Sequence, residues 1–129
     1  MAMNDIISAM GMTAKQLLDF VGIKMEPHEF YQPWVIAYLV EASGSAPVSE
    51  IAAAYPPSLN NQAKKISLEH RLRDQAIRKV LTRHNVVKYH KGYVTLNCGL
   101  LSPSDRLRII STCLTREFQG KNLAHVLSH

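Results

Sequence analysis

Only one stretch of this chain has the pattern of a β-hairpin, and it limits the fold more than any other feature. Residues 86–89 and 93–96 are rich in β-branched and aromatic side chains, which favour strands. Between them, Gly92 suits the left-handed position of a type I turn with a G1 bulge. The other patterns are helical, so we expect a mainly α fold with a small β-hairpin, of the α+β class.

Three helix signals precede this hairpin. Thr13 begins the first helix, Gln16 completes its capping box, and Gly22 is expected to end it. The second helix begins at Pro33 and is apolar nearly all round, so it should be buried at the centre of the fold. A third, short helix begins at Pro47 and is stopped by a pair of prolines.

Two longer helices are predicted, one on each side of the hairpin. The first spans residues 67–84, with Ser67 as its N-cap and Asn85 as a left-handed C-cap. Its apolar residues spread over a broad face when they are drawn with the period of an α-helix. The second begins at Ser102 and ends at Gly120, and its expected core stripe is Leu107, Ile110, Leu114 and Phe118.

The length and composition fit one compact domain. A chain of 129 residues, 47% of them hydrophobic, is long enough to bury one core. We divide it into an N-terminal helical extension over residues 1–32, a core over 33–98, and a C-terminal helix and tail over 99–129.

Positive charge is concentrated in one segment. Residues 60–92 hold nine Lys and Arg against two acids, a net charge of +7, whereas residues 1–59 have a net charge of −4. This excess indicates a surface that binds a polyanion such as nucleic acid. The alternative is a solvated helix face that happens to be basic.

The order of the elements resembles that of a winged helix-turn-helix domain. Residues 34–55 combine an apolar helix, a Gly-containing break and a Val-Ser-Glu-Ile-Ala run, a common pattern for the first two helices of that superfamily. Residues 71–81 look like its recognition helix and residues 86–96 like its wing, so the resemblance covers about half of the chain. The turn over residues 56–66 is longer than usual, which is similar to the N-terminal DNA-reader modules of HNH-type and Mrr-type restriction endonucleases.

The resemblance implies a winged helix-turn-helix core over residues 33–98, with additional N- and C-terminal helices, that binds double-stranded DNA. A helix over residues 67–84 fits the major groove, and the hairpin over 86–96 can lie on the DNA backbone. Arg pairs with guanine and Gln with adenine, so we expect base contacts from Arg71, Gln75, Arg78, Asn60 and Asn61. Phosphate contacts are expected from Lys64, Lys65, Ser67, Lys79, Lys88, His90 and Lys91.

Structural roles are the alternative for several of these residues. Arg71 and Arg78 are then only solvated, with Arg78 held by Asp74 one helical turn away. Lys91 is then a charged hairpin tip, and the two Asn belong to a turn. The two tyrosines of the hairpin either stack on bases or sugars or pack across the strands.

The sequence carries no signature of catalysis. It contains no Gly-rich phosphate loop, no nucleophile elbow, no HNH-type cluster and no carboxylate pair followed by Glu-x-Lys. We therefore expect a protein that is not an enzyme, with no catalytic residue and no cofactor.

The cysteines and the hydropathy bear on the compartment. Cys98 and Cys113 are expected as free thiols in a reducing compartment, with a lone disulfide as the alternative. A zinc site that adds His125 and His129 lacks a knuckle turn, so we expect no metal. No membrane span or signal peptide is visible, which indicates a cytoplasmic protein.

Together these features predict a sequence-dependent or modification-dependent double-stranded DNA-binding domain. It would be the reader module of a restriction endonuclease or a small transcriptional regulator, with DNA and either a nuclease domain or a second copy of itself as partners. The alternative is a winged-helix module for protein–protein interaction or dimerisation that does not bind DNA.

Overall fold

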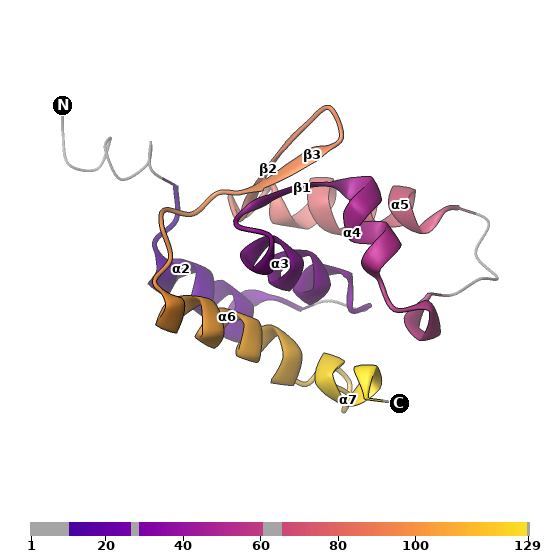
Figure 1. Ribbon diagram of the computed structural model, residues 1–129. Coiled ribbons are helices and arrows are strands. Elements are labelled where there is room, and N and C mark those ends of the chain that lie inside the picture. Colours follow the sequence, from indigo (N-terminus) through magenta and orange to yellow (C-terminus); the bar gives the residue numbers. More distant parts are fainter. Residues whose placement is uncertain (1–10, 27–28, 61–65, 129) are drawn as a thin grey trace.

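The computed structural model describes residues 11–26, 29–60 and 66–128. Most of these residues are helical, and a small antiparallel sheet completes the fold, so the expected α+β class is confirmed. The elements follow one another in the order α2 (Ala14–Asp19), η1 (Phe20–Lys24), α3 (Tyr31–Glu41), β1 (Ser45–Pro47), α4 (Val48–Ala54), η2 (Pro57–Leu59), α5 (Leu68–Arg71), η3 (Leu72–Leu81), β2 (Val87–His90), β3 (Tyr93–Leu96), α6 (Pro103–Thr115) and α7 (Leu123–Leu127) (Figure 1).

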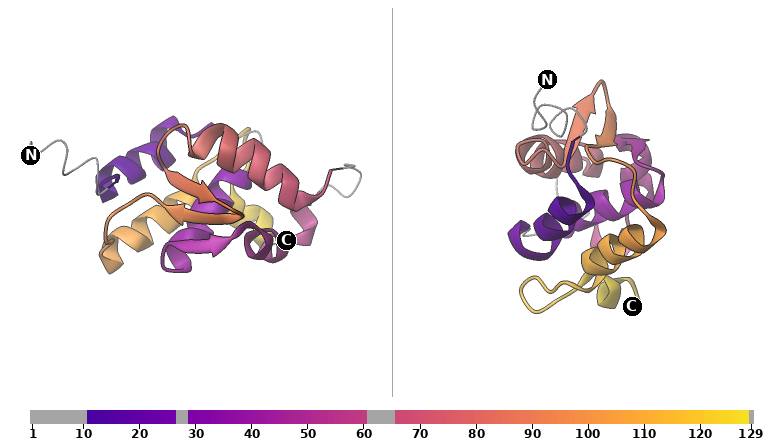
Figure 2. Two further views of the ribbon diagram at one scale, coloured as in Figure 1. Left: turned by 90° about the horizontal axis from the view of Figure 1, so that it is seen from above. Right: turned by 90° about the vertical axis from the view of Figure 1, so that its left-hand side faces the viewer.

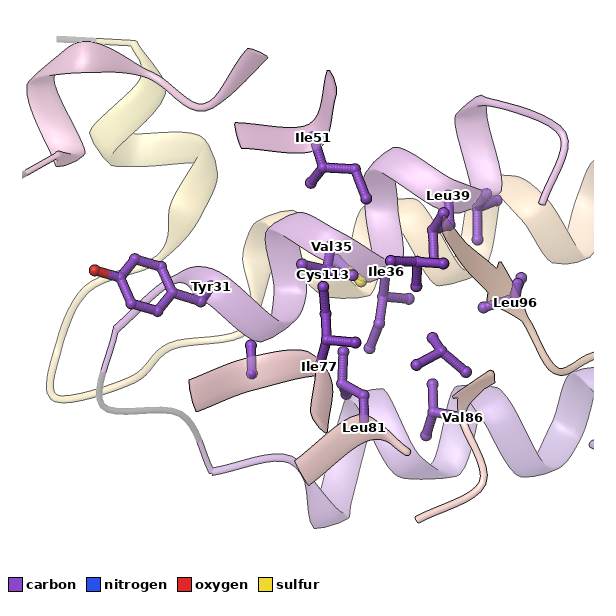
Figure 3. Packing of buried hydrophobic residues seen from close by; sticks show 14 of the residues in the cluster. Tyr31, Val35, Ile36, Leu39, Ile51, Ile77, Leu81, Val86, Leu96 and Cys113 are labelled. Atoms are coloured by element: carbon purple, nitrogen blue, oxygen red, sulfur yellow. The ribbon is translucent and has the colours of Figure 1, made fainter. Parts of the chain in front are cut away.

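Helix α3 lies at the centre of the fold, as its apolar sequence predicts. In Figure 1, α2 and α6 lie on one side of α3, whereas the sheet, α4 and α5 lie on the other. Val35, Ile36 and Leu39 of α3 are fully buried, and Figure 3 shows them among side chains of α4, η3 and β3. The helix begins at Tyr31, two residues before the expected start at Pro33.

The N- and C-terminal helices share this core. Leu17 and Phe20 from the N-terminal side, and Ile109 and Cys113 from α6, belong to the same cluster of buried residues as α3. Helix α6 contacts both α2 and α3. The packing of both ends therefore holds α3 in place and supports the elements on its far side.

The hairpin forms where the sequence predicts it, but with a tighter turn. His90 pairs with Tyr93, so the loop contains only Lys91 and Gly92. Both loop residues have positive φ, 47° and 84°. This is the pattern of a type I′ turn, whose twist matches that of the two strands. The expected type I turn with a bulge is therefore wrong.

A third strand was not predicted. Strand β1 pairs with β3 in antiparallel register, with Ser45 opposite Thr95 and Pro47 opposite Tyr93, and the strand order is β1-β3-β2. β1 has only three residues and ends in proline, which is tolerated at the end of an edge strand. Its sequence has the composition of a turn, so only the pairing with β3 reveals it.

The helix starts are predicted better than the helix ends. Thr13 and Gln16 form the expected capping box, and Ser102 accepts a hydrogen bond from the backbone N–H of Asp105. The helix does not end at Gly22, however, because η1 continues it to Lys24. The added turn is held by contacts with distant residues: Arg116 donates hydrogen bonds to the carbonyls of Val21 and Ile23, and Met25, which follows the turn, is buried in the core. These contacts offset the cost of about 1 kcal/mol for a glycine inside the helix.

The core stripe expected on α6 is only partly right: Ile110 and Phe118 are partly buried and pack against the core, but Leu107 does not. Leu107 is 70% exposed, whereas Ile109 and Cys113 are buried. The helix ends at Thr115 rather than at Gly120. The helix ends here because the next residue, Arg116, has an extended backbone. Its guanidinium donates hydrogen bonds to backbone carbonyls of η1.

Candidate nucleic-acid interface

The helix expected over residues 67–84 is built from α5 and η3. Ser67 is its N-cap, as predicted, and its hydroxyl accepts a hydrogen bond of 3.2 Å from the backbone N–H of His70. The helix ends at Leu81, and Asn85 has the positive φ, 60°, of the expected left-handed residue. The hairpin follows directly, and β2 contacts η3 (Figure 2).

Helix η3 is of the π type rather than the α type. The backbone N–H of Thr82 donates to the carbonyl of Ile77, five residues earlier, at 2.9 Å. The buried residues recur at intervals of four and five: Leu72, Ala76, Ile77 and Leu81. An α-helix has fewer residues per turn than a π-helix. Plotted with the α-helical period, these buried residues therefore spread over a broad apolar face. The broad apolar face is the sequence feature that indicates a π-type helix.

Three of the predicted side chains lie on the outward side of η3. Gln75, Arg78 and Lys79 are exposed, whereas Ala76 and Ile77 between them are buried. Gln75 and Arg78 are therefore accessible to a ligand that lies along the helix. Arg83, in the turn after η3, is also exposed. Arg83 is not among the contacts predicted from the sequence, and an α-helical period places it on the apolar face.

Arg71 does not belong to this outward side, which corrects the sequence prediction. Its side chain is only 3% exposed. The guanidinium donates to the Tyr31 hydroxyl at 2.6 Å, to Oδ1 of Asn60 at 2.7 Å and to the carbonyl of Ile66 at 3.1 Å. Its carbon also lies 5.9 Å from the centre of the Tyr31 ring. With its donors used inside the protein, Arg71 cannot contact a base.

Asn60 shares this internal role. The residue is partly buried, and its side-chain oxygen is the acceptor for Arg71. It therefore connects the segment after η2 to the first turn of α5, and its predicted base contact stays a prediction. The other predicted residues of the same loop, Asn61, Lys64 and Lys65, lie outside the described residues.

Arg78 forms an ion pair with Asp74, the alternative that the sequence left open, but only a long one. Asp74 accepts two hydrogen bonds from Arg73, 2.9 Å from Nε and 3.3 Å from Nη2. Arg78 approaches the same carboxylate only to 4.0 Å, and its side chain remains 63% exposed. The hydrogen bonds from Arg73, with smaller contributions from Arg78 and His70, lower the pKa of Asp74. Asp74 therefore stays ionised and is neutralised mainly by Arg73.

The hairpin presents its predicted basic residues to solvent. Lys88 and His90 are exposed, and they alternate along β2 with residues that face the core. Lys91 is exposed at the tip. Because β2 contacts η3, these groups flank the helix, and both elements face the viewer in the left-hand view of Figure 2.

The two hairpin tyrosines do not pack on each other. Tyr89 pairs with Val94 and packs against the core, whereas Tyr93 pairs with His90 and is 54% exposed. The two rings thus lie on opposite faces of the sheet, and the packing alternative fits Tyr89 but not Tyr93. Tyr93 is the aromatic ring available to a ligand on the outer face.

The cysteines are free thiols in the structure. Cys98 is half-buried and Cys113 is buried, where loss of hydration raises the pKa of its thiol to about 12. No group of three or more His, Cys, Asp or Glu within the described ranges is arranged to hold a metal ion. His129 lies outside those ranges. No helix of the described residues is long and apolar enough to cross a membrane.

Comparison of the chain with protein-family models, with curated proteins and with solved structures finds no match. The exposed residues of η3 and of the hairpin are therefore the observations that bear on function.

Proposed function

We propose that this chain is a double-stranded DNA-binding domain of the winged helix-turn-helix type. In this proposal α5 and η3 form the recognition helix, and β2 and β3 form the wing. The order of α3, α4, the basic helix and the hairpin supports the assignment, because it is the order that the resemblance implies.

One observation carries the proposal. Arg78 is exposed on η3, Gln75 is exposed on another side of the same helix, and the exposed Lys88, His90 and Lys91 lie on or at the tip of the hairpin, whose strand β2 contacts η3. A helix fits the major groove, where Arg and Gln each form paired hydrogen bonds with guanine and adenine. Basic groups beside the helix fix its register through the phosphates.

Arg78 is the side chain best placed to read a base. It is mostly exposed, and its nearest carboxylate already receives two hydrogen bonds from Arg73. A guanidinium with free donors can bind O6 and N7 of guanine together.

The test is fluorescence anisotropy with labelled oligonucleotides. The probes are a random duplex, the same duplex with methylated adenine or methylated cytosine, and a single strand, each at two salt concentrations. We expect duplex binding that weakens steeply with salt. A preference for one methylated duplex would favour the reader module of a restriction endonuclease over a transcriptional regulator.

Variants connect the binding to the proposed face. Arg78→Ala should weaken duplex binding, whereas Arg108→Ala removes an equally charged, exposed residue of α6 and should not. Helix α6 lies on the opposite side of α3 from the hairpin, so Arg108 is a matched control (Figure 1). Equal DNA binding by both variants and the wild type would refute the recognition-helix assignment. It would favour the alternative, a module for protein–protein interaction.

A further inference from the structure

The outer face of the small sheet is open to solvent. Side chains alternate along a strand, and Val87, Val94 and Leu96 are buried in the core, so the residues between them point to the other side. The hairpin also projects beyond the helices in Figure 1. The register of the three strands arranges the outward residues in two rows across the sheet, and the two rows differ in chemistry.

The row nearer to the hairpin tip consists of rings. Tyr93 on β3 lies opposite His90 on β2 and opposite Pro47 on β1. Adjacent strands are about 4.8 Å apart, so the phenol, the imidazole and the pyrrolidine are direct neighbours. Tyr93 is 54% exposed, His90 is exposed and Pro47 is partly buried. Such a row suits the flat face of a nucleobase, because bases stack on aromatic side chains whatever their sequence.

The second row consists of hydrogen-bond donors. Thr95 on β3 lies opposite Lys88 on β2 and opposite Ser45 on β1, and all three are exposed. The hydroxyls of Ser45 and Thr95 lie 3.2 Å apart and share a hydrogen bond, so they are on the same face. One of the two O–H donors remains available, because only one of them is used in that bond. With the ammonium group of Lys88, this row suits a phosphate.

The spacing of the rows fits an unpaired strand. Residues two apart in a strand are separated by about 7 Å, so a nucleotide whose base stacks on Tyr93 has its phosphate within reach of the long Lys88 side chain. None of the outward side chains in the two rows is acidic, so none of them repels the phosphate. A double helix cannot use the ring row, because its bases are already stacked on each other.

We propose that the outer face of the sheet binds single-stranded DNA, with a base stacked on Tyr93 and a phosphate bound by Lys88 and Thr95. This function goes beyond the duplex recognition proposed above, which depends on η3 and makes no use of Tyr93. Lys88 serves in both, so a single strand and a duplex compete for it, a consequence that rests on the proposed function. The binding of the single strand itself does not.

The test is fluorescence anisotropy of the full chain with labelled oligothymidine of about ten nucleotides, which cannot pair with itself. We expect saturable binding that weakens with salt. Tyr93→Ala should weaken it about 5- to 150-fold, the equivalent of about 1–3 kcal/mol for one stacked base. Tyr93→Phe keeps the ring and should bind within about twofold of the wild type. Absence of saturable binding, or unchanged binding by Tyr93→Ala, would overturn the proposal.

Further variants assign the phosphate contact and separate the two proposals. Lys88→Ala should weaken oligothymidine binding, whereas Lys121→Ala removes an exposed lysine between α6 and α7 and should not. An equal loss in both variants would refute the assignment, because it would show attraction by net charge alone. Arg78→Ala should lose duplex affinity and keep its affinity for oligothymidine. Duplex binding without oligothymidine binding would overturn only this proposal, and the reverse result would overturn only the duplex proposal.

Discussion

Replacing Arg71 by alanine should destabilise the fold without removing a DNA contact. Its guanidinium donates three hydrogen bonds, and a hydrogen bond to a charged group contributes about 1.5–3 kcal/mol. The Tyr31 hydroxyl is buried and loses its donor entirely, whereas the acceptors on Asn60 and Ile66 are only partly buried and recover water. Counting one full bond and half of each of the other two gives a loss of about 3–6 kcal/mol. This is a large part of the ~5–15 kcal/mol that stabilises a typical domain.

Urea unfolding followed by circular dichroism measures this loss. With a slope of about 2 kcal/mol per molar urea, the middle of the usual range, the midpoint should fall by about 1.5–3 M while the slope stays the same. Arg78→Ala is the control, because its exposed side chain should change stability by no more than about 0.5 kcal/mol. A wild-type midpoint for Arg71→Ala, together with a loss of DNA affinity as large as that of Arg78→Ala, would refute the buried role.

Three further predictions concern the interface and the buried thiol. Arg78→Ala should cost about 1–3 kcal/mol of duplex affinity, about 5- to 150-fold by anisotropy, with Arg108→Ala unchanged. The double variant Lys88→Ala/Lys91→Ala should reduce the slope of log affinity against log salt by about 2, and an unchanged slope would place both lysines away from the phosphates. The pKa of Cys113 is raised to about 12 by burial, so the folded state holds this proton more tightly than the unfolded state. The stability that this provides is present below about pH 8.5 and is lost progressively as the pH rises towards 12. Urea unfolding at pH 8 and pH 10.5 should therefore show a larger alkaline loss for the wild type than for Cys113→Ala.

The parts of the fold that local sequence determines were predictable. The caps at Thr13, Ser67 and Ser102 depend on side chains within three residues, and all three are present as expected. The hairpin and the central position of α3 also follow from local composition and hydropathy. In each case the residues that determine the structure lie close together in one short segment of the sequence.

What escaped prediction depends on contacts between distant segments. Strand β1 exists because it pairs with β3, about fifty residues later in the chain. The helix continues through Gly22 to a turn whose carbonyls, at Val21 and Ile23, accept hydrogen bonds from Arg116, and α6 ends where Arg116 makes these bonds. A π-type helix in place of an α-helix changes which side chains face outward. In a single sequence, the only indication of this change is that the apolar face is unusually broad.

The burial of Arg71 changes how the positive charge of this chain should be counted. Of the bases in the +7 segment, Arg71 is internal and Arg73 is bound to Asp74, so the charge offered to a polyanion is smaller than the sequence total suggests. Among the described residues, the remaining positive charge lies on the C-terminal part of the helix, in the turn after it and on the hairpin. Arg71 has a positioning role in this arrangement, because it ties the start of α5 to α3 through Tyr31 and to the preceding loop through Asn60. A helix fixed at its first turn can present Arg78 in one orientation, which is what base recognition requires.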